Sequence, residues 1–142
     1  MTETVELLNC IHANARIGLD ALGRLIKQCE DATFRNVMAV EFAEYNEIVE
    51  ESEELLKKRN QHPKGCAAFS KTSMGAGLKL NVLIDKTSSH MAEMILLGST
   101  MGIIDMTRHL NEFPGADEEV RALGEKLLKT EENNFASMRE HL

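Results

Sequence analysis

Hydrophobic residues recur along most of the chain at alternating steps of three and four positions, which is the period of a helix buried on one face. The pattern predicts four helices, over residues 3–29, 32–59, 78–111 and 117–142. Thr2 or Thr4 is expected to cap the first helix and Asp31 the second, because their side chains accept bonds from free backbone amides. The predicted fold class is therefore all-α.

The connections between these segments predict how the helices are arranged. Two short turns, at Glu30–Asp31 and Phe113–Ala116, favour two antiparallel hairpins. The long connection, residues 60–77, holds a proline and several glycines and is expected to cross between the hairpins. Its part Ala67–Met74 could extend the third helix backwards. Residues 1–142 are expected to form one domain, an antiparallel four-helix bundle.

Composition and charge limit the partners that the chain can have. Of its 142 residues, 43% are hydrophobic and 27% are charged, which is enough apolar material for a globular core. The net charge of −7 and the lack of a Lys/Arg stripe argue against binding to nucleic acid or to an anionic membrane. The acidic N-terminus does not read as a signal peptide, and no apolar run of about 18 residues predicts a membrane span. A cytoplasmic protein is expected.

The cysteines and the known catalytic motifs suggest no reaction. Cys10, Cys29 and Cys66 are an odd number without CxxC spacing, and they are expected to be free and reduced. No phosphate-binding glycine loop, no Gly-x-Ser-x-Gly and no His-Glu-x-x-His motif is present. No catalytic residue is therefore assigned.

Four polar residues lie on helix faces that otherwise carry apolar side chains: Glu41, Glu44, Glu131 and His12. A buried carboxylate is costly unless it is paired, protonated or metal-bound, and bundles build metal sites from such inward-facing groups. If both short turns lie at one end, the helical rise places His12, Glu131 and Glu44 about 27, 26 and 21 Å below it. Glu41 lies about one turn away, so the four residues are candidate ligands of one metal site.

Two helices also resemble those of a known family. Residues 34–44, FRNVMAVEFAE, resemble the metal-binding helix of ferritin-like proteins such as rubrerythrins, where an aromatic residue precedes Glu-x-x-His. Residues 127–134, LLKTEENN, resemble the counterpart helix, and the layout is similar to small bacterial ferritin-like proteins of unassigned function. The resemblance implies a bundle that binds iron or manganese. Glu44 and Asn134 replace the two histidines, so the ligand set is incomplete.

Two functions remain open from the sequence. The first is a non-enzymatic bundle that acts through self-association or an unknown protein partner. The three glutamates would then be boundary carboxylates that reach solvent or basic side chains, and His12 a core-edge histidine bonded to a carboxylate. The second is a degenerate ferritin-like metal site with a redox or iron-handling role.

The third helix is apolar almost all round from Met91 to Met106, which a helix with one inward face does not require. Gly98 and Gly102 lie on one face, where another helix backbone can approach closely. One interpretation is a tightly packed central helix. The other is a homodimer with Gly98, Met101 and Gly102 at the interface, made adaptable by methionine side chains.

Overall fold

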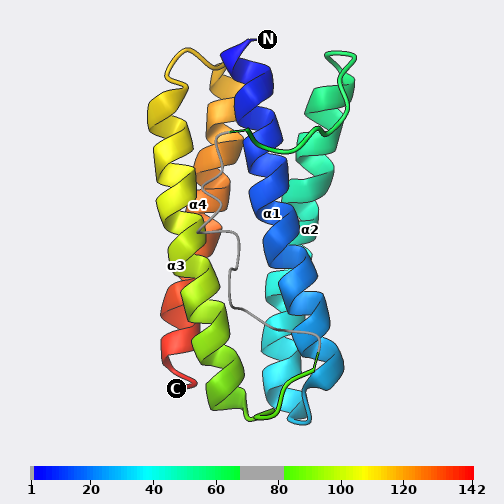
Figure 1. The fold of residues 1–142 in the computed structure, drawn as a ribbon, viewed down its shortest axis with the longest axis vertical. Coiled ribbons are helices and arrows are strands. Elements are labelled where there is room, and N and C mark those ends of the chain that lie inside the picture. Colours follow the sequence, from blue (N-terminus) through cyan, green and yellow to red (C-terminus); the bar gives the residue numbers. More distant parts are fainter. Residues whose placement is uncertain (1, 68–81) are drawn as a thin grey trace.

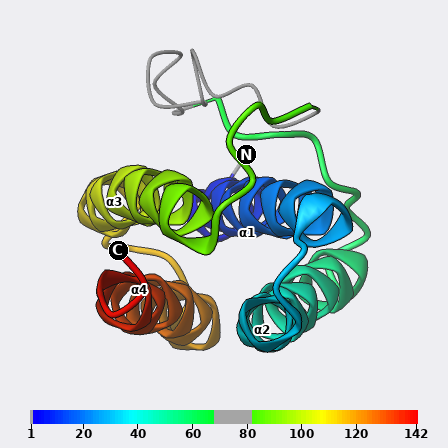
Figure 2. The same ribbon diagram turned by 90° about the horizontal axis from the view of Figure 1, so that it is seen from below.

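The computed structural model describes residues 2–67 and 82–142, in which four long helices lie side by side (Figure 1). They are α1 (Glu3–Gln28), α2 (Ala32–Lys57), α3 (Ser88–Glu112) and α4 (Glu118–Arg139). Figure 2 shows α1 and α3 in one layer and α2 and α4 in the other. No strand occurs in the two described ranges, so the all-α prediction with four helices is confirmed.

Local capping explains where the first two helices begin. The Thr2 hydroxyl accepts a hydrogen bond of 3.3 Å from the backbone N–H of Val5. Asp31 Oδ1 accepts bonds of 2.9 and 3.2 Å from the N–H groups of Thr33 and Phe34. Of the two candidates for the first cap, Thr2 is the residue that serves, and the cap predicted at Asp31 is confirmed.

The third helix begins later than the sequence predicts. Residues 82–87 are not helical, and α3 starts at Ser88. The Thr87 hydroxyl accepts a bond of 3.2 Å from the N–H of His90, and Asp85 Oδ1 accepts one of 2.9 Å from the N–H of Thr87. These side chains favour a turn and a cap over a continued helix. Residues 78–81, and nearly all of Ala67–Met74, lie outside the described residues.

The two short turns lie at opposite ends of the molecule, which corrects the expectation that they share one end (Figure 1). Gly115 N–H donates to Glu3 Oε2 at 2.6 Å, and Asp117 N–H donates to Thr4 Oγ1 at 2.9 Å. The α3–α4 turn is therefore held against the beginning of α1. The α1–α2 turn comes directly after Gln28, the last residue of α1, and therefore lies at the opposite end of the molecule.

The long connection between α2 and α3 is anchored at both ends of α1. Near its start, Lys64 N–H donates to Asn9 Oδ1 at 2.9 Å. Near its finish, Leu83 N–H donates to Gln28 Oε1 at 2.8 Å. The connection therefore passes from the end of the molecule where α1 begins to the end where α1 finishes. This path follows from the opposite placement of the two short turns.

Cys10 and Cys66 form a disulfide across a sequence separation of 56 residues, while Cys29 is a buried free thiol. The expectation that all three cysteines are reduced is therefore wrong for two of them. The bond between Lys64 and Asn9 explains the pairing, because it brings the segment that carries Cys66 onto α1 beside Cys10. Disulfides persist in oxidising compartments, so the cysteines no longer support a cytoplasmic location.

The core is built from leucine, isoleucine, valine and methionine side chains of all four helices. Met91 and Met106 of α3 are fully buried in it, as expected for a helix that is apolar on several faces. Among the described residues, none of the helices has the length and hydropathy needed to cross a bilayer.

Candidate functional site

A polar cluster lies within this apolar core. Its members are Glu41 and Tyr45 of α2, Ser99 of α3, and Glu131 and Asn134 of α4, and all five are buried. Spacings of four residues on α2 and three on α4 place the members of each pair on one helix face. The cluster therefore draws its side chains from three helices.

The geometry of the cluster leaves several carboxyl oxygens without a partner. Tyr45 donates a hydrogen bond of 2.7 Å from its hydroxyl to Glu131 Oε1. Glu41 and Glu131 are each only 3% exposed. Both carboxyl oxygens of Glu41, Oε2 of Glu131 and Nδ2 of Asn134 have no hydrogen-bond partner among the described residues. Buried polar atoms are nearly always bonded in folded proteins, so this group requires an explanation.

Burial also controls the charge of the two carboxyl groups. Loss of solvation, together with the neighbouring charges of Glu44 and Glu131, raises the pKa of Glu41 to about 8. Loss of solvation likewise raises the pKa of Glu131 to about 8, although the hydroxyls of Tyr45 and Ser99 oppose the rise. Both groups therefore hold protons at neutral pH, when nothing else compensates their charge.

Two glycines make room for the cluster. A Cβ atom at Gly102 would lie 2.7 Å from Glu131 Oε2, and one at Gly18 would lie 2.7 Å from the Tyr45 ring. Neither distance is compatible with a side chain at these positions unless the cluster moves. The Gly102 carbonyl also accepts a bond of 3.3 Å from Asn14 Nδ2, which ties α3 to α1 at this level.

The structure places the four predicted metal ligands in two regions. Glu41 and Glu131 lie in the core cluster, and Glu44 is half-buried beside it, with a pKa raised by burial and by the charge of Glu47. His12 lies elsewhere: its Nε2 is 2.9 Å from Glu53 Oε2, in a partly exposed pair between α1 and α2. His12 is therefore a core-edge histidine bonded to a carboxylate, which was the alternative interpretation of this residue from the sequence.

Sequence reasoning missed three members of the cluster. Tyr45 follows Glu41 by one helical turn, and Asn134 follows Glu131 by three residues at the position where the ferritin-like motif has histidine. Both spacings were visible in the sequence. Ser99 carried no such signal, because a serine on a mostly apolar helix has many ordinary roles.

The residues expected at a dimer interface lie on α3. Gly98 is half-buried, and a Cβ atom there would meet none of the described residues within 4 Å. Met101 is half-buried as well. Gly102 is buried against Glu131 and faces the interior of the bundle.

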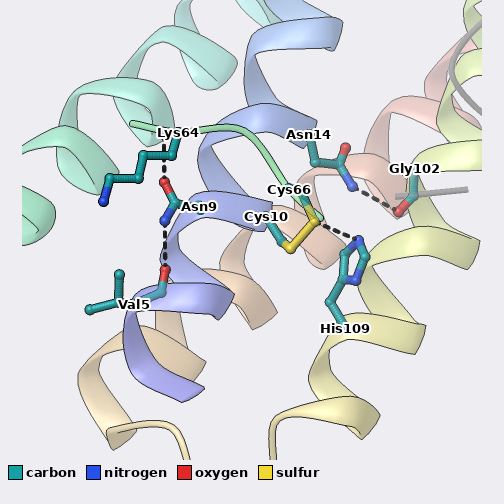
Figure 3. The surroundings of a disulfide bond; sticks show 8 residues. All are labelled: Val5, Asn9, Cys10, Asn14, Lys64, Cys66, Gly102 and His109. Atoms are coloured by element: carbon teal, nitrogen blue, oxygen red, sulfur yellow. Dashed lines mark hydrogen bonds between the residues drawn. A yellow bond between two sulfur atoms is a disulfide. The ribbon is translucent and has the colours of Figure 1, made fainter. Parts of the chain in front are cut away.

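A second group of chemically active side chains lies near the end of the molecule where α1 begins. The Sγ atoms of Cys10 and Cys66 and a ring nitrogen of His109 lie within 4.8 Å of one another. Of the described histidine, cysteine and acidic side chains, only these form a group of three or more at such distances. Figure 3 shows them converging from α1, from the long connection and from α3.

Comparison with known proteins shows the fold and no function. No family model matches the chain, and no curated protein matches it significantly. The crystal structure of a DUF305 fragment from Deinococcus radiodurans is similar, with a TM-score of 0.74 and 14% identity over 99% of this chain and 95% of that chain. At this identity the likeness shows a shared helical fold alone. No catalytic or other specific function is evident from it.

Proposed function

We propose that the protein binds a divalent metal ion in its core, between Glu41 on α2 and Glu131 on α4. The observation that carries the proposal is the set of three carboxyl oxygens that are buried without a partner in the described structure. A cation between them would compensate both carboxylates and replace their protons. Strongly perturbed, buried carboxyl pairs of this kind are common at functional sites.

The donor atoms indicate which metal the site prefers. Carboxylate oxygens of Glu41 and Glu131 would be the ligands, with the side chains of Asn134 and Tyr45 close by. Because His12 pairs with Glu53, the set contains oxygen donors and no imidazole. Oxygen donors suit manganese, magnesium and calcium, whereas imidazole suits iron better. Manganese(II) is therefore the first ion to test and iron(II) the second.

The topology supports a relationship to ferritin-like bundles. The connection between the two helical hairpins is bonded to Asn9 near the beginning of α1 through Lys64, and to Gln28 at its end through Leu83. Glu41 and Glu131 are the glutamates of the two segments that resemble rubrerythrin helices. We assign metal binding to this antiparallel, ferritin-like arrangement and assign no reaction to it, because the motif histidines are replaced.

The proposal is tested by thermal unfolding of the disulfide-intact protein with manganese(II) or, without oxygen, iron(II). An ion that binds only the folded state stabilises it, by about 2.7 kcal/mol at a hundredfold excess over its Kd. Glu131→Gln and Glu41→Gln should each abolish the rise in melting temperature. Glu132→Gln is the matched control, since Glu132 is the exposed neighbour of Glu131 on the same helix. No shift in the native protein with either ion would refute the proposal.

A second function, self-association, is favoured by the outer face of α3. Leu97 and Ile104 are 49% and 45% exposed, and they lie two helical turns apart, on the same face as the half-buried Met101. We propose that this face pairs with the same face of a second copy, with Gly98 beside it. Sedimentation equilibrium should show a dimer that Leu97→Asp converts to a monomer. A monomer at all accessible concentrations would rule the dimer out.

A further inference from the structure

Cysteine and histidine side chains are common metal ligands, and Cys10, Cys66 and His109 lie together here. The two sulfurs are joined in a disulfide. Cys10 and His109 are buried, and Cys66 is half-buried. Nε2 of His109 lies 3.8 Å from Cys66 Sγ, next to the disulfide that joins Cys66 to Cys10 (Figure 3). Two sulfurs and one ring nitrogen therefore already share one small volume.

The surrounding structure holds this arrangement independently of the disulfide. Cys10 is fixed by α1 and His109 by the last turn of α3. Lys64, two residues before Cys66, is tied to α1 by its bond of 2.9 Å to Asn9 Oδ1. Asn9 Nδ2 in turn donates to the Val5 carbonyl at 3.1 Å, which fixes the asparagine side chain. The three groups should therefore stay close when the bond between the sulfurs is broken.

Reduction converts the two sulfurs into ligands. A dithiol reductant attacks Cys66 Sγ through its thiolate, and Cys10 leaves as a thiolate. The second thiol of the reductant then displaces Cys66 and closes the reductant into its own disulfide. Two electrons pass to the protein, and two protons complete the thiols of Cys10 and Cys66.

We propose that the reduced protein binds Zn²⁺ through Cys10, Cys66 and His109, and that the disulfide form does not. Zinc displaces the two thiol protons, which are released to solvent, and the His109 ring supplies a nitrogen lone pair. Two thiolates and one imidazole are a ligand set that zinc accepts, with one further position open to water. In the disulfide the same sulfurs carry no charge and are poor ligands, so the disulfide form holds no ion at these atoms.

This site is separate from the core cluster, because it uses none of the residues of the proposed carboxylate site. Only the site at Cys10, Cys66 and His109 has sulfur ligands, so an experiment that detects sulfur coordination distinguishes it from the carboxylate site. The disulfide form keeps Glu41 and Glu131 but lacks thiolates, so zinc that binds to both redox forms belongs to the carboxylates. Cobalt(II) in place of zinc gives an intense thiolate-to-metal absorption band only where cysteine is a ligand.

The experiment compares the full chain in its disulfide form and after reduction with a phosphine that is then removed. Zinc affinity is measured against a chromogenic chelator, and cobalt(II) spectra are recorded on the same samples. The reduced protein should bind zinc stoichiometrically, show the thiolate band and gain melting temperature with zinc. The disulfide form should show no thiolate band and should bind one zinc ion fewer per chain than the reduced form. Equal zinc binding by both forms, or no thiolate band after reduction, would overturn the proposal.

Single substitutions identify which side chains bind the zinc ion. Cys10→Ser and Cys66→Ser should lose stoichiometric zinc binding and the thiolate band, and His109→Gln should weaken binding while keeping the band. Cys29→Ser is the matched control, because Cys29 is also a buried cysteine but bonds the Asp31 carbonyl instead. It should bind zinc as the native protein does, and a loss equal to that of Cys10→Ser would contradict the assignment. Should a serine variant fail to fold, the comparison of the two redox forms of the native protein decides the question by itself.

Discussion

Tyr45 donates a hydrogen bond of 2.7 Å to Glu131 Oε1, so that α2 and α4 are joined through two buried side chains within the core. Lys126 also links these helices, through Glu47 and Glu51, but that contact lies at the surface. Exposed ion pairs contribute little to stability, whereas a buried bond has a high cost when one partner is lost. Among the described residues, the Tyr45–Glu131 bond is therefore a buried polar contact between α2 and α4 whose loss should be costly.

Replacing Tyr45 with phenylalanine keeps the ring and removes the donor. Glu131 then loses a hydrogen bond inside the core, and the free energy of unfolding should fall by about 1–3 kcal/mol. Urea unfolding measures the loss. The same substitution made in a Glu131→Leu background should cost clearly less, because no acceptor remains there. Equal losses in the two backgrounds would show that the bond contributes nothing.

Gly102 and Gly98 form a matched pair on one helix. Alanine at Gly102 would put a Cβ atom 2.7 Å from Glu131 Oε2, so the carboxyl group must move, and we expect a net loss of about 1–3 kcal/mol. Alanine at Gly98 meets none of the described residues within 4 Å and should stabilise the helix by up to about 1 kcal/mol. Thermal unfolding of both variants checks the contrast. Similar effects at the two positions would contradict the placement of Glu131.

The acidity of the core carboxyls predicts how stability depends on pH. Burial raises the pKa of Glu41 and of Glu131 from 4.5 to about 8. Between these values the folded protein holds protons that the unfolded chain has released, so the free energy of unfolding falls as pH rises. This contribution is fully present below pH 4.5 and is lost as pH passes about 8.

Glu131→Gln removes one of the two titrating groups. The free energy of unfolding of this variant should therefore fall less steeply as pH rises. The difference between variant and native protein should grow in favour of the variant from about pH 5 to pH 8, by roughly 1 kcal/mol or more. Urea unfolding of the metal-free protein at several pH values gives the two slopes. Glu132→Gln, at an exposed position, should keep the native slope. A variant slope equal to the native one would mean that Glu131 is already ionised at neutral pH.

The disulfide predicts a separate loss of stability on reduction. Joining Cys10 to Cys66 closes a loop with a sequence separation of 56 residues, which stabilises the folded state by about 4 kcal/mol in the chain-entropy description. Reduction should lower the melting temperature accordingly in zinc-free buffer. Cys29→Ser should show the same loss, because Cys29 lies outside the bond. An unchanged melting temperature after complete reduction would show that closing this loop adds no measurable stability to the contacts that already hold the segment.

Helical periodicity and capping residues were sufficient to predict the fold class. The four apolar stripes, Asp31 and the two short turns are local signals, and the structure contains four helices where they indicate them. The start of α3 was missed because the stripe continues through Leu83, which is buried although it is not helical. Burial periodicity alone therefore cannot locate a helix start when a preceding segment also packs on the core.

The candidate site was predicted only in part, because it depends on which ends of the helices meet. With the two turns at opposite ends, the helical rise puts Glu41 about 24 Å and Glu131 about 20 Å from the end where α1 begins. His12 then lies about 13 Å from that end, too far to join them. The disulfide was missed for a similar reason, since a bond across the long connection depends on tertiary contacts such as that of Lys64 with Asn9.

Metal binding at the core carboxylates is tested most directly by titrating the disulfide-intact protein with manganese(II) and recording the electron paramagnetic resonance signal of the free ion. The account predicts that the native protein and Glu132→Gln remove manganese from solution stoichiometrically. It predicts that the double variant Glu41→Gln, Glu131→Gln leaves the free-ion signal as it is in buffer. Loss of signal that is equal in the native protein and in the double variant, or no loss in either, would contradict a metal site between α2 and α4.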